Sequence, residues 1–129
     1  MHAASLRVLL VEDFELMRNL IRTVLEKRPG VQIIAEASDG IDAVHQAAQL
    51  KPDLILLDIG LPRLNGIEAA RQIRELSPQS KIIFLSQESS PEIIEEAMSV
   101  GCGYVIKAKV APQLLSAVDA VLRGETFVS

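Results

Sequence analysis

Residues 54–58, Leu-Ile-Leu-Leu-Asp, form a short apolar run that ends on a carboxylate. Two other segments are built in the same way: residues 6–13 end on an acid pair, and residues 104–107 end on a lysine. Short apolar runs of this kind are typical of buried strands in a parallel sheet that is covered by helices. Ligands bind outside the carboxyl ends of such strands. The sequence therefore predicts three acids and one ammonium at a single edge of an α/β sheet.

Apolar runs alternate with helical patterns along the whole chain. Strands are predicted at residues 6–11, 31–36, 54–57, 81–85 and 103–106. Between them, apolar residues recur at spacings of three and four, which is the pattern of helices that pack one face on a sheet. The first helix has its apolar stripe on Met17, Leu20, Ile21, Val24 and Leu25. Five strand–helix units predict an α/β fold with a doubly wound, five-stranded parallel sheet and helices on both faces.

Residues that favour helix starts precede three of the helical segments. Asp39, Asn65 and Ser90 are expected N-caps, and Pro91 follows Ser90 at the first helical position. Before the fifth helix, Ala111 stands where a cap is expected, and alanine is a poor cap. The sequence therefore specifies the start of the fifth helix less firmly than the starts of the others.

The bulk composition limits the class of protein. The chain has 129 residues, of which 49% are hydrophobic and 3% aromatic, so we expect an aliphatic core. A net charge of −4 argues against a nucleic-acid-binding surface. The single cysteine, Cys102, excludes an internal disulfide and fits a reducing compartment. With no signal-peptide or membrane-spanning pattern, we expect a cytoplasmic protein that contacts neither membrane nor nucleic acid.

The length and the pattern together predict a single domain over residues 1–129, with its core at about residues 6–124 and no output domain. The fifth helix is predicted to end at Gly124, which leaves residues 125–129 as a stub. His2 and His45 have no partner at metal-ligand spacing, so both are expected to face solvent.

The charged residues at the strand ends have structural interpretations as well as chemical ones. Asp58 can cap amides of the loop that follows it, and Asp13 can N-cap the first helix, whereas Glu12 has no comparable role. Three acids close together repel one another unless a cation or a proton joins them. Their oxygens suit a hard divalent cation, Mg²⁺ or Mn²⁺, with phosphate oxygens as further ligands. Lys107 and Ser86 can then pair with an incoming anion.

These residues, in this order and spacing, resemble the receiver domains of bacterial two-component response regulators. The resemblance covers roughly residues 6–124 and implies the flavodoxin-like receiver fold. Its motifs are the acid pair after the first strand, Asp-Ile-x-Leu-Pro-x-x-Asn-Gly over residues 58–66, Ser86 after the fourth strand, and Tyr-x-x-Lys over residues 104–107. Residues 124–129 resemble the end of receivers that precede a helix-turn-helix DNA-binding domain.

The resemblance implies a role for each residue of the cluster. Asp58 would be the phosphoacceptor, which takes a phosphoryl group from a sensor histidine kinase, a phosphotransfer protein or a small phosphodonor. Mg²⁺ would be held by Asp13, Asp58 and the backbone carbonyl of Gly60, with Glu12 as the other acid of the pair. Lys107 would contact the phosphoryl group.

Two further residues would act as a switch. The resemblance implies that Ser86 reorients toward the phosphoryl group and that the ring of Tyr104 turns inward when Ser86 moves. Tyr104 can equally be a partly buried strand residue with a hydrated hydroxyl. The expected output surface runs over residues 91–124, and formation of a homodimer on activation is an expected consequence. The chain would then be a signal receiver that catalyses its own Mg²⁺-dependent phosphorylation and dephosphorylation, and not an enzyme in the usual sense.

The sequence departs from the family pattern near the expected phosphoryl site. Gln87 stands where the family usually has a small residue, which narrows access to Asp58. Gly60 offers no side chain and Glu88 is acidic, so both alter the expected lifetime of the phosphate. Ala108 follows Lys107 where many receivers have proline.

Three other functions compete with this interpretation. An aspartate-nucleophile phosphatase of the haloacid dehalogenase type needs a second aspartate two residues after the nucleophile, where this chain has Gly60. A flavodoxin-like cofactor binder needs a phosphate-cradling loop after the first strand, where residues 12–15 carry three acids. A receiver that works only as a binding or dimerisation module stays open because of Gln87.

Overall fold

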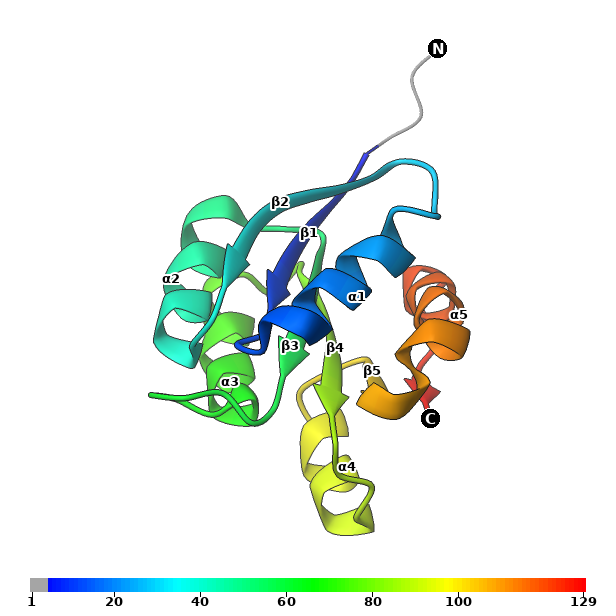
Figure 1. Ribbon diagram of the computed structural model, residues 1–129. Coiled ribbons are helices and arrows are strands. Elements are labelled where there is room, and N and C mark those ends of the chain that lie inside the picture. Colours follow the sequence, from blue (N-terminus) through cyan, green and yellow to red (C-terminus); the bar gives the residue numbers. More distant parts are fainter. Residues whose placement is uncertain (1–4) are drawn as a thin grey trace.

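The computed structural model describes residues 5–129 and shows a fully parallel sheet between two layers of helices (Figure 1). The strands are β1 (Leu6–Val11), β2 (Val31–Ala37), β3 (Leu54–Asp58), β4 (Lys81–Ser86), β5 (Gly103–Ile106) and β6 (Phe127–Val128). They lie in the order β2-β1-β3-β4-β5-β6, and each neighbouring pair is parallel. The chain changes direction across the sheet at β1 and β3, which is where doubly wound sheets bind their ligands.

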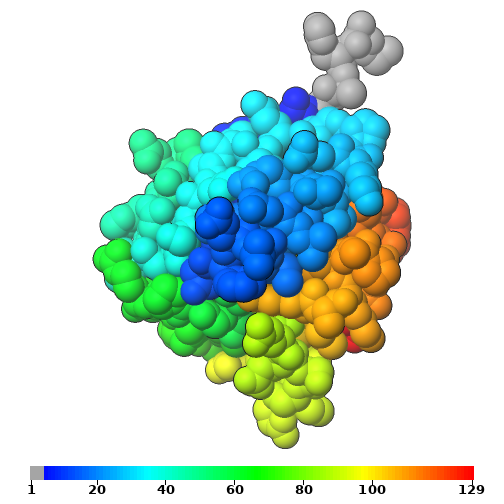
Figure 2. Space-filling model, viewed as in Figure 1, coloured from blue at the N-terminus to red at the C-terminus, as the bar shows by residue number. Residues whose placement is uncertain are grey.

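Five helices cover the two faces of the sheet. The helices α1 (Glu15–Leu25) and α5 (Val110–Leu122) pack on one face, and α2 (Gly40–Leu50), α3 (Gly66–Leu76) and α4 (Pro91–Met98) pack on the other (Figure 1). A short 3₁₀ turn, η1 (Lys107–Lys109), joins β5 to α5. Figure 2 shows the β4–α4 region standing out from the rest of the molecule at the lower edge of the view.

The central strand β3 separates two hydrophobic cores. Leu54 and Leu56 pack with residues of α1 and α5, whereas Ile55 and Leu57 pack with residues of α2 and α3. This alternation follows from the two-residue period of a strand, and all four side chains are fully buried. Residues 54–57 therefore fill the cores on both faces of the sheet. The first charged residue after them, Asp58, falls at the sheet edge.

The predicted N-caps of three helices are confirmed. Asp39, Asn65 and Ser90 cap α2, α3 and α4, and each side-chain oxygen accepts a hydrogen bond from the amide three residues later. Pro91 occupies the first turn of α4, as predicted. Each cap pairs one of the amides that a helix start leaves without a partner inside the helix. The loops at the carboxyl edge of the sheet thus enter their helices at defined points.

The predicted five-stranded sheet is confirmed in its topology, but the count was one strand short. Residues 125–129 do not form a stub: Phe127–Val128 pairs in parallel with β5 as β6. Two residues are too few to show a strand pattern in a sequence, and only the neighbouring edge of β5 decides their conformation. Pairing with that edge also covers backbone groups that would otherwise face solvent.

Two predictions about helices were wrong in detail. Leu20 does not belong to the buried stripe of α1 and is 39% exposed, because the helix meets the sheet through Ile21, Val24 and Leu25. Ala111 is not the cap of α5, because the helix already begins at Val110. No side chain caps that start, since η1 leads directly into the helix.

His45 is exposed, as predicted, and His2 lies outside the described residues. Within residues 5–129, none of the helices combines the length and the apolar character needed to span a bilayer. The peptide bonds of the described residues are all trans, the one between Lys107 and Ala108 included.

Candidate functional site

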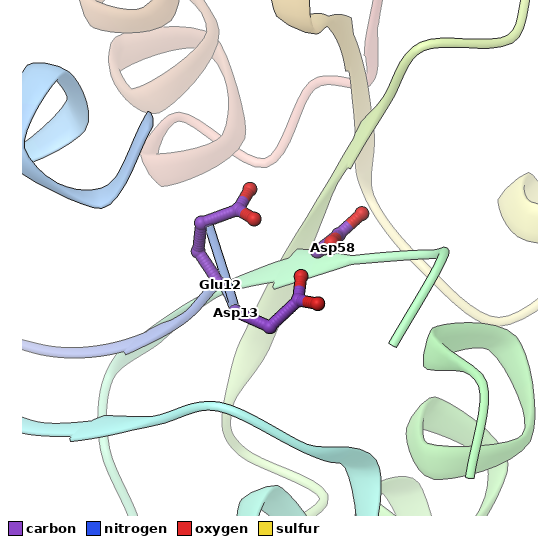
Figure 3. A group of neighbouring side chains, drawn as sticks. All are labelled: Glu12, Asp13 and Asp58. Atoms are coloured by element: carbon purple, nitrogen blue, oxygen red, sulfur yellow. The ribbon is translucent and has the colours of Figure 1, made fainter. Parts of the chain in front are cut away.

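The three predicted acids do lie together at the carboxyl edge of the sheet (Figure 3). Glu12 and Asp13 follow β1, and Asp58 is the last residue of β3, which lies directly beside β1. One carboxylate oxygen of each of these acids lies within 4.8 Å of the others. Glu12 and Asp58 are buried, whereas Asp13 is exposed. The cluster thus combines two buried carboxylates with one that solvent reaches.

The predicted lysine completes the cluster. Lys107 Nζ lies 2.9 Å from Oε1 of Glu12 and 3.1 Å from Oδ1 of Asp58. Its strand, β5, is not adjacent to β3, because β4 lies between them, so the long lysine side chain reaches across the end of β4. Three carboxylates against one ammonium leave two negative charges in excess when all four groups are ionised.

Burial makes this excess charge costly. Burial raises the pKa of the Glu12 carboxyl above its ordinary value, although Lys107 and the amide of Phe14 lower it. Burial also raises the pKa of Asp58, against the opposing charge of Lys107 and the amide of Gly60. For Lys107, burial alone would lower the pKa, but the hydrogen bond to Glu12 and the charge of Asp58 outweigh it, so the pKa is raised. Both carboxylates are therefore less stable as anions here than in water.

Glu12, and not Asp13, contacts the start of α1. Asp13 does not N-cap α1; the cap position belongs to Phe14, which makes no side-chain cap bond. Instead Glu12 Oε2 accepts a hydrogen bond of 3.0 Å from the amide of Phe14, and Arg18 donates to the backbone carbonyl of Glu12 at 2.9 Å. Glu12 is thus fixed on both its backbone and its side chain, and Asp13 keeps an exposed carboxylate.

Asp58 caps an amide of the loop that follows it, as the sequence suggested, and it also lies in the acid cluster. Its Oδ1 accepts a hydrogen bond of 3.0 Å from the amide of Gly60 and also faces Lys107. Gly60 is exposed, and a Cβ built on it would come no closer than 3.9 Å to Oδ1, so the missing side chain leaves this side of Asp58 open.

Gly66, the last residue of the motif over residues 58–66, supports Asp58. A Cβ on Gly66 would lie 2.2 Å from the backbone oxygen of Asp58, which a side chain cannot do, so residue 66 must be glycine. The amide of Gly66 donates to the carbonyl of Ile59 at 2.8 Å and closes the loop after β3. The Asn65-Gly66 pair was visible in the sequence, but the close approach that requires the glycine was not.

The two predicted switch residues both contact the backbone of Glu88. Ser86 is buried and its Oγ accepts a hydrogen bond of 2.9 Å from the amide of Glu88. Tyr104 is fully buried, and its hydroxyl donates to the carbonyl of Glu88 at 2.8 Å. The alternative of a partly buried tyrosine with a hydrated hydroxyl was therefore wrong. The role of the Glu88 backbone leaves no signal in the sequence, because every residue type except proline supplies the same two groups.

A cavity of about 450 Å³ opens above the cluster. Asp13, Asp58, Ser86 and Lys107 line its polar side. Phe14, Met17 and Ile93 contribute apolar lining, with Gln87 and Glu88 at the same opening. Gln87 is exposed at this opening, and its effect on access to Asp58 stays a prediction.

Comparison with known proteins identifies the family. The sequence matches the family described as "Response regulator receiver domain" over residues 8–119. This chain belongs to that family. The predicted family is confirmed, and the phosphatase and the flavodoxin-like cofactor binder are set aside.

Similar curated proteins include transcriptional regulators. The chain is 36% identical over 128 residues to the uncharacterized transcriptional regulatory protein YxjL of Bacillus subtilis (strain 168), covering 98% of the chain and 59% of that protein. It is 38% identical over 122 residues to the transcriptional regulatory protein LiaR of the same organism, covering 93% of the chain and 57% of LiaR. The receiver therefore spans a little over half the length of these curated relatives.

A solved structure agrees over nearly the whole receiver. The two-component response regulator of the LuxR family from Aurantimonas sp. SI85-9A1 superimposes with a TM-score of 0.90 at 30% identity. The match covers 96% of this chain and 89% of that structure. The predicted receiver fold is thereby confirmed, and the chain is a signalling domain of response regulators, not a conventional enzyme.

Proposed function

We propose that this receiver is switched by a phosphoryl group carried on Asp58. The observation that carries the proposal is the placement of Asp58: a buried carboxylate at the sheet edge, 3.1 Å from the only lysine of the cluster and open to the cavity. The two contacts described for it, with Gly60 and Lys107, both fall on Oδ1. We assign Oδ2 as the oxygen that attacks phosphorus.

The charges of the cluster fit a divalent cation. Two buried carboxylates with raised pKa values and an exposed third one form an all-oxygen donor set with negative charge in excess, which is the environment that Mg²⁺ or Mn²⁺ prefers. Asp13, Asp58 and the carbonyl of Gly60 would hold the ion, with Glu12 behind them. When bound, the ion neutralises charge on the phosphoryl oxygens and on the attacking carboxylate.

The remaining steps belong to side chains of this chain. Asp58 attacks phosphorus in line, and the bond from phosphorus to the histidine nitrogen or the acyl oxygen of the donor breaks as the new oxygen–phosphorus bond forms. The Lys107 ammonium, which contacts Glu12 and Asp58, would also pair with the phosphoryl oxygens. Ser86 lies at the end of β4 beside the same cavity and can donate its hydroxyl proton to the phosphoryl group. That movement would release the amide of Glu88, while Tyr104 would still hold the carbonyl of the same residue. Phosphorylation and dephosphorylation are then reactions that the receiver catalyses on itself.

The partners follow from this chemistry and from the relatives. The phosphodonor is a histidine kinase, a phosphotransfer protein or a small acyl phosphate. Because relatives that match nearly the whole chain are transcriptional regulators, the phosphorylated receiver would control a DNA-binding output domain through the surface of α4, β5 and α5. Homodimer formation on activation is part of the proposal. The receiver itself would bind no specific DNA.

Intact mass tests the proposal directly. We would incubate the chain with acetyl phosphate, with and without Mg²⁺, beside Asp58→Asn and Asp53→Asn. Asp53 is a matched control because it is an aspartate at the opposite end of β3. We expect one added phosphoryl group, only with Mg²⁺, in the unaltered chain and in Asp53→Asn. No addition in the presence of Mg²⁺, or equal addition to Asp58→Asn, would overturn the proposal and leave a receiver that acts as a binding module.

A further inference from the structure

The short C-terminal strand is tied to the backbone of the functional site. β6 pairs with β5 so that Gly103 lies opposite Phe127 and Tyr104 opposite Val128. The amide of Phe127 donates to the carbonyl of Cys102 at 3.2 Å, and the Phe127 side chain packs against the core under α5. The segment is thus held both by backbone pairing and by an apolar side chain.

Ser129 extends this pairing past the end of β6. Its amide donates to the carbonyl of Tyr104 at 2.9 Å. Its hydroxyl oxygen accepts a hydrogen bond of 3.0 Å from the amide of Ile106 and donates its proton to Oε1 of Gln113 at 2.7 Å. One side chain therefore joins the C-terminal segment, the end of β5 and the first turns of α5.

Ile106 is the residue through which this arrangement reaches the site. On its other side it lies opposite Ser86 in the pairing of β4 with β5. The next residue is Lys107, whose ammonium lies between Glu12 and Asp58. The amide that Ser129 holds thus belongs to a residue that is the strand neighbour of one site residue and the chain neighbour of another.

We propose that Ser129 is a positioning residue for Lys107: by fixing Ile106 and Gln113 it sets the end of β5 from which the ammonium reaches the phosphoryl site. The proposal rests on the proposed function of that site. Because a coupling between two sites is reciprocal, a phosphoryl group that draws Lys107 and Ser86 into place must also tighten the docking of β6. The C-terminal segment then senses the state of Asp58 through hydrogen bonds already present in the structure.

Two probes distinguish an effect on Lys107 from an effect on the metal ligands. Beryllium fluoride with Mg²⁺ serves as the phosphoryl probe, and Mg²⁺ alone serves as a probe of the acids. For Ser129→Ala we expect affinity for beryllium fluoride to fall roughly three- to tenfold, as for the loss of a single hydrogen bond. Affinity for Mg²⁺ alone should stay unchanged, because Lys107 is not a ligand of the ion. Ser129→Thr, which keeps the hydroxyl, should restore the affinity.

A matched control and a second measurement complete the test. Thr23→Ala removes a hydroxyl that donates to the carbonyl of Asn19 on α1, so it should leave both affinities unchanged. In the unaltered chain, hydrogen exchange at Phe127 and Ser129 should slow when beryllium fluoride binds. Binding with equal affinity by Ser129→Ala and no change in exchange would overturn the coupling alone. An unaltered chain that fails to bind beryllium fluoride would overturn the proposed function and the coupling with it.

Discussion

Polar side chains have different partners at the two ends of the parallel sheet. At the amino end, the Arg7 guanidinium donates to the carbonyls of Leu50 and Lys51, at 2.7 and 2.9 Å, and Asp53 accepts from the amide of Arg7 at 2.8 Å. At the carboxyl end, three carboxylates share one ammonium. The amino end pairs its polar groups with backbone, whereas the carboxyl end gathers charge that its own residues do not balance.

This difference marks the carboxyl end as the end that can bind a charged ligand. Even the buried hydroxyls of Ser77 and Ser80 at the amino end bond to each other at 2.6 Å. At the carboxyl end, buried Oε1 of Glu12 and Oδ1 of Asp58 share the single ammonium of Lys107, at 2.9 and 3.1 Å. Unbalanced buried charge lowers stability unless a ligand compensates it. The comparison therefore predicts that equivalent substitutions at the two ends have unequal effects.

The largest difference should come from removing the cation at each end. Lys107→Met leaves two buried carboxylates without a counter-charge, so we expect the free energy of unfolding in urea to fall by about 3 kcal/mol without metal. Arg7→Met removes hydrogen bonds to two carbonyls at a more exposed position and should cost about 1 kcal/mol. Added Mg²⁺ should recover part of the loss in Lys107→Met only. Equal losses at the two ends would contradict the comparison.

Removing one carboxylate from each end should change stability at the carboxyl end and leave it nearly unchanged at the amino end. Without metal, Asp58→Asn relieves a buried anion whose pKa is raised, so we expect a gain of about 1 kcal/mol in the free energy of unfolding. Asp53→Asn keeps an acceptor oxygen for the amide of Arg7 and should change stability by less than about 0.5 kcal/mol. Thermal unfolding measures both. A loss of stability in Asp58→Asn would show that its charge is already balanced.

In the absence of metal, acidification from neutral pH should raise the stability of the folded protein through the acids at the carboxyl end. The pKa values of Glu12 and Asp58 are raised above 4.5 and 3.8, so their protonated forms favour the folded state. That contribution is present below the ordinary values and is lost as pH rises through the raised ones. We expect stability to rise from neutral pH toward the ordinary carboxyl range, and the rise to be absent from the double variant Glu12→Gln, Asp58→Asn.

Asp39, a carboxyl outside the cluster, should change stability with pH in the opposite direction. The amide of Asp42 lowers the pKa of the N-cap Asp39 below 3.8, so the contribution of Asp39 is present above that value and is lost only at lower pH. Its pH window therefore does not overlap that of the cluster. Equal pH dependence in the unaltered chain and the double variant would refute the assignment of the acid-stabilised window to Glu12 and Asp58.

The smallest expected effect concerns access to the carboxyl end. Gln87 is exposed at the cavity opening, so Gln87→Ala should speed phosphorylation by acetyl phosphate roughly threefold without changing stability. The time course of intact mass measures the rate, and Gln79→Ala, an exposed glutamine before β4, is the matched control. A rate unchanged from that of the control would show that Gln87 does not restrict access.

The sequence was sufficient where local patterns decide the outcome. The end of β3 and the position of Asp58 follow from an apolar run and its first charged residue, and the caps at Asp39 and Asn65 follow from local residue preferences. The site could be assembled because parallel strands end at one edge, so residues from distant parts of the chain meet there. Lys107 reaches the acids for the same reason, although β4 intervenes.

The sequence was insufficient where tertiary contacts decide. Phe127–Val128 becomes a strand only because the edge of β5 is free to pair with it. The hydroxyl of Tyr104 finds a backbone carbonyl, and a carbonyl leaves no trace in the choice of residue type. Likewise, Glu12 rather than Asp13 receives the amide of Phe14, because the turn geometry and not the residue type selects between neighbouring acids. These are the contacts that connect the site to its surroundings.

A Mg²⁺ titration followed by thermal unfolding tests most directly the claim that the carboxyl end needs a cation. A ligand that binds only the folded state raises its stability with concentration. We predict that Mg²⁺ stabilises the unaltered chain and Asp53→Asn, and that Asp13→Asn, which changes an exposed carboxylate and leaves the core intact, abolishes most of the effect. Equal stabilisation of all three proteins, or of none, would contradict the account.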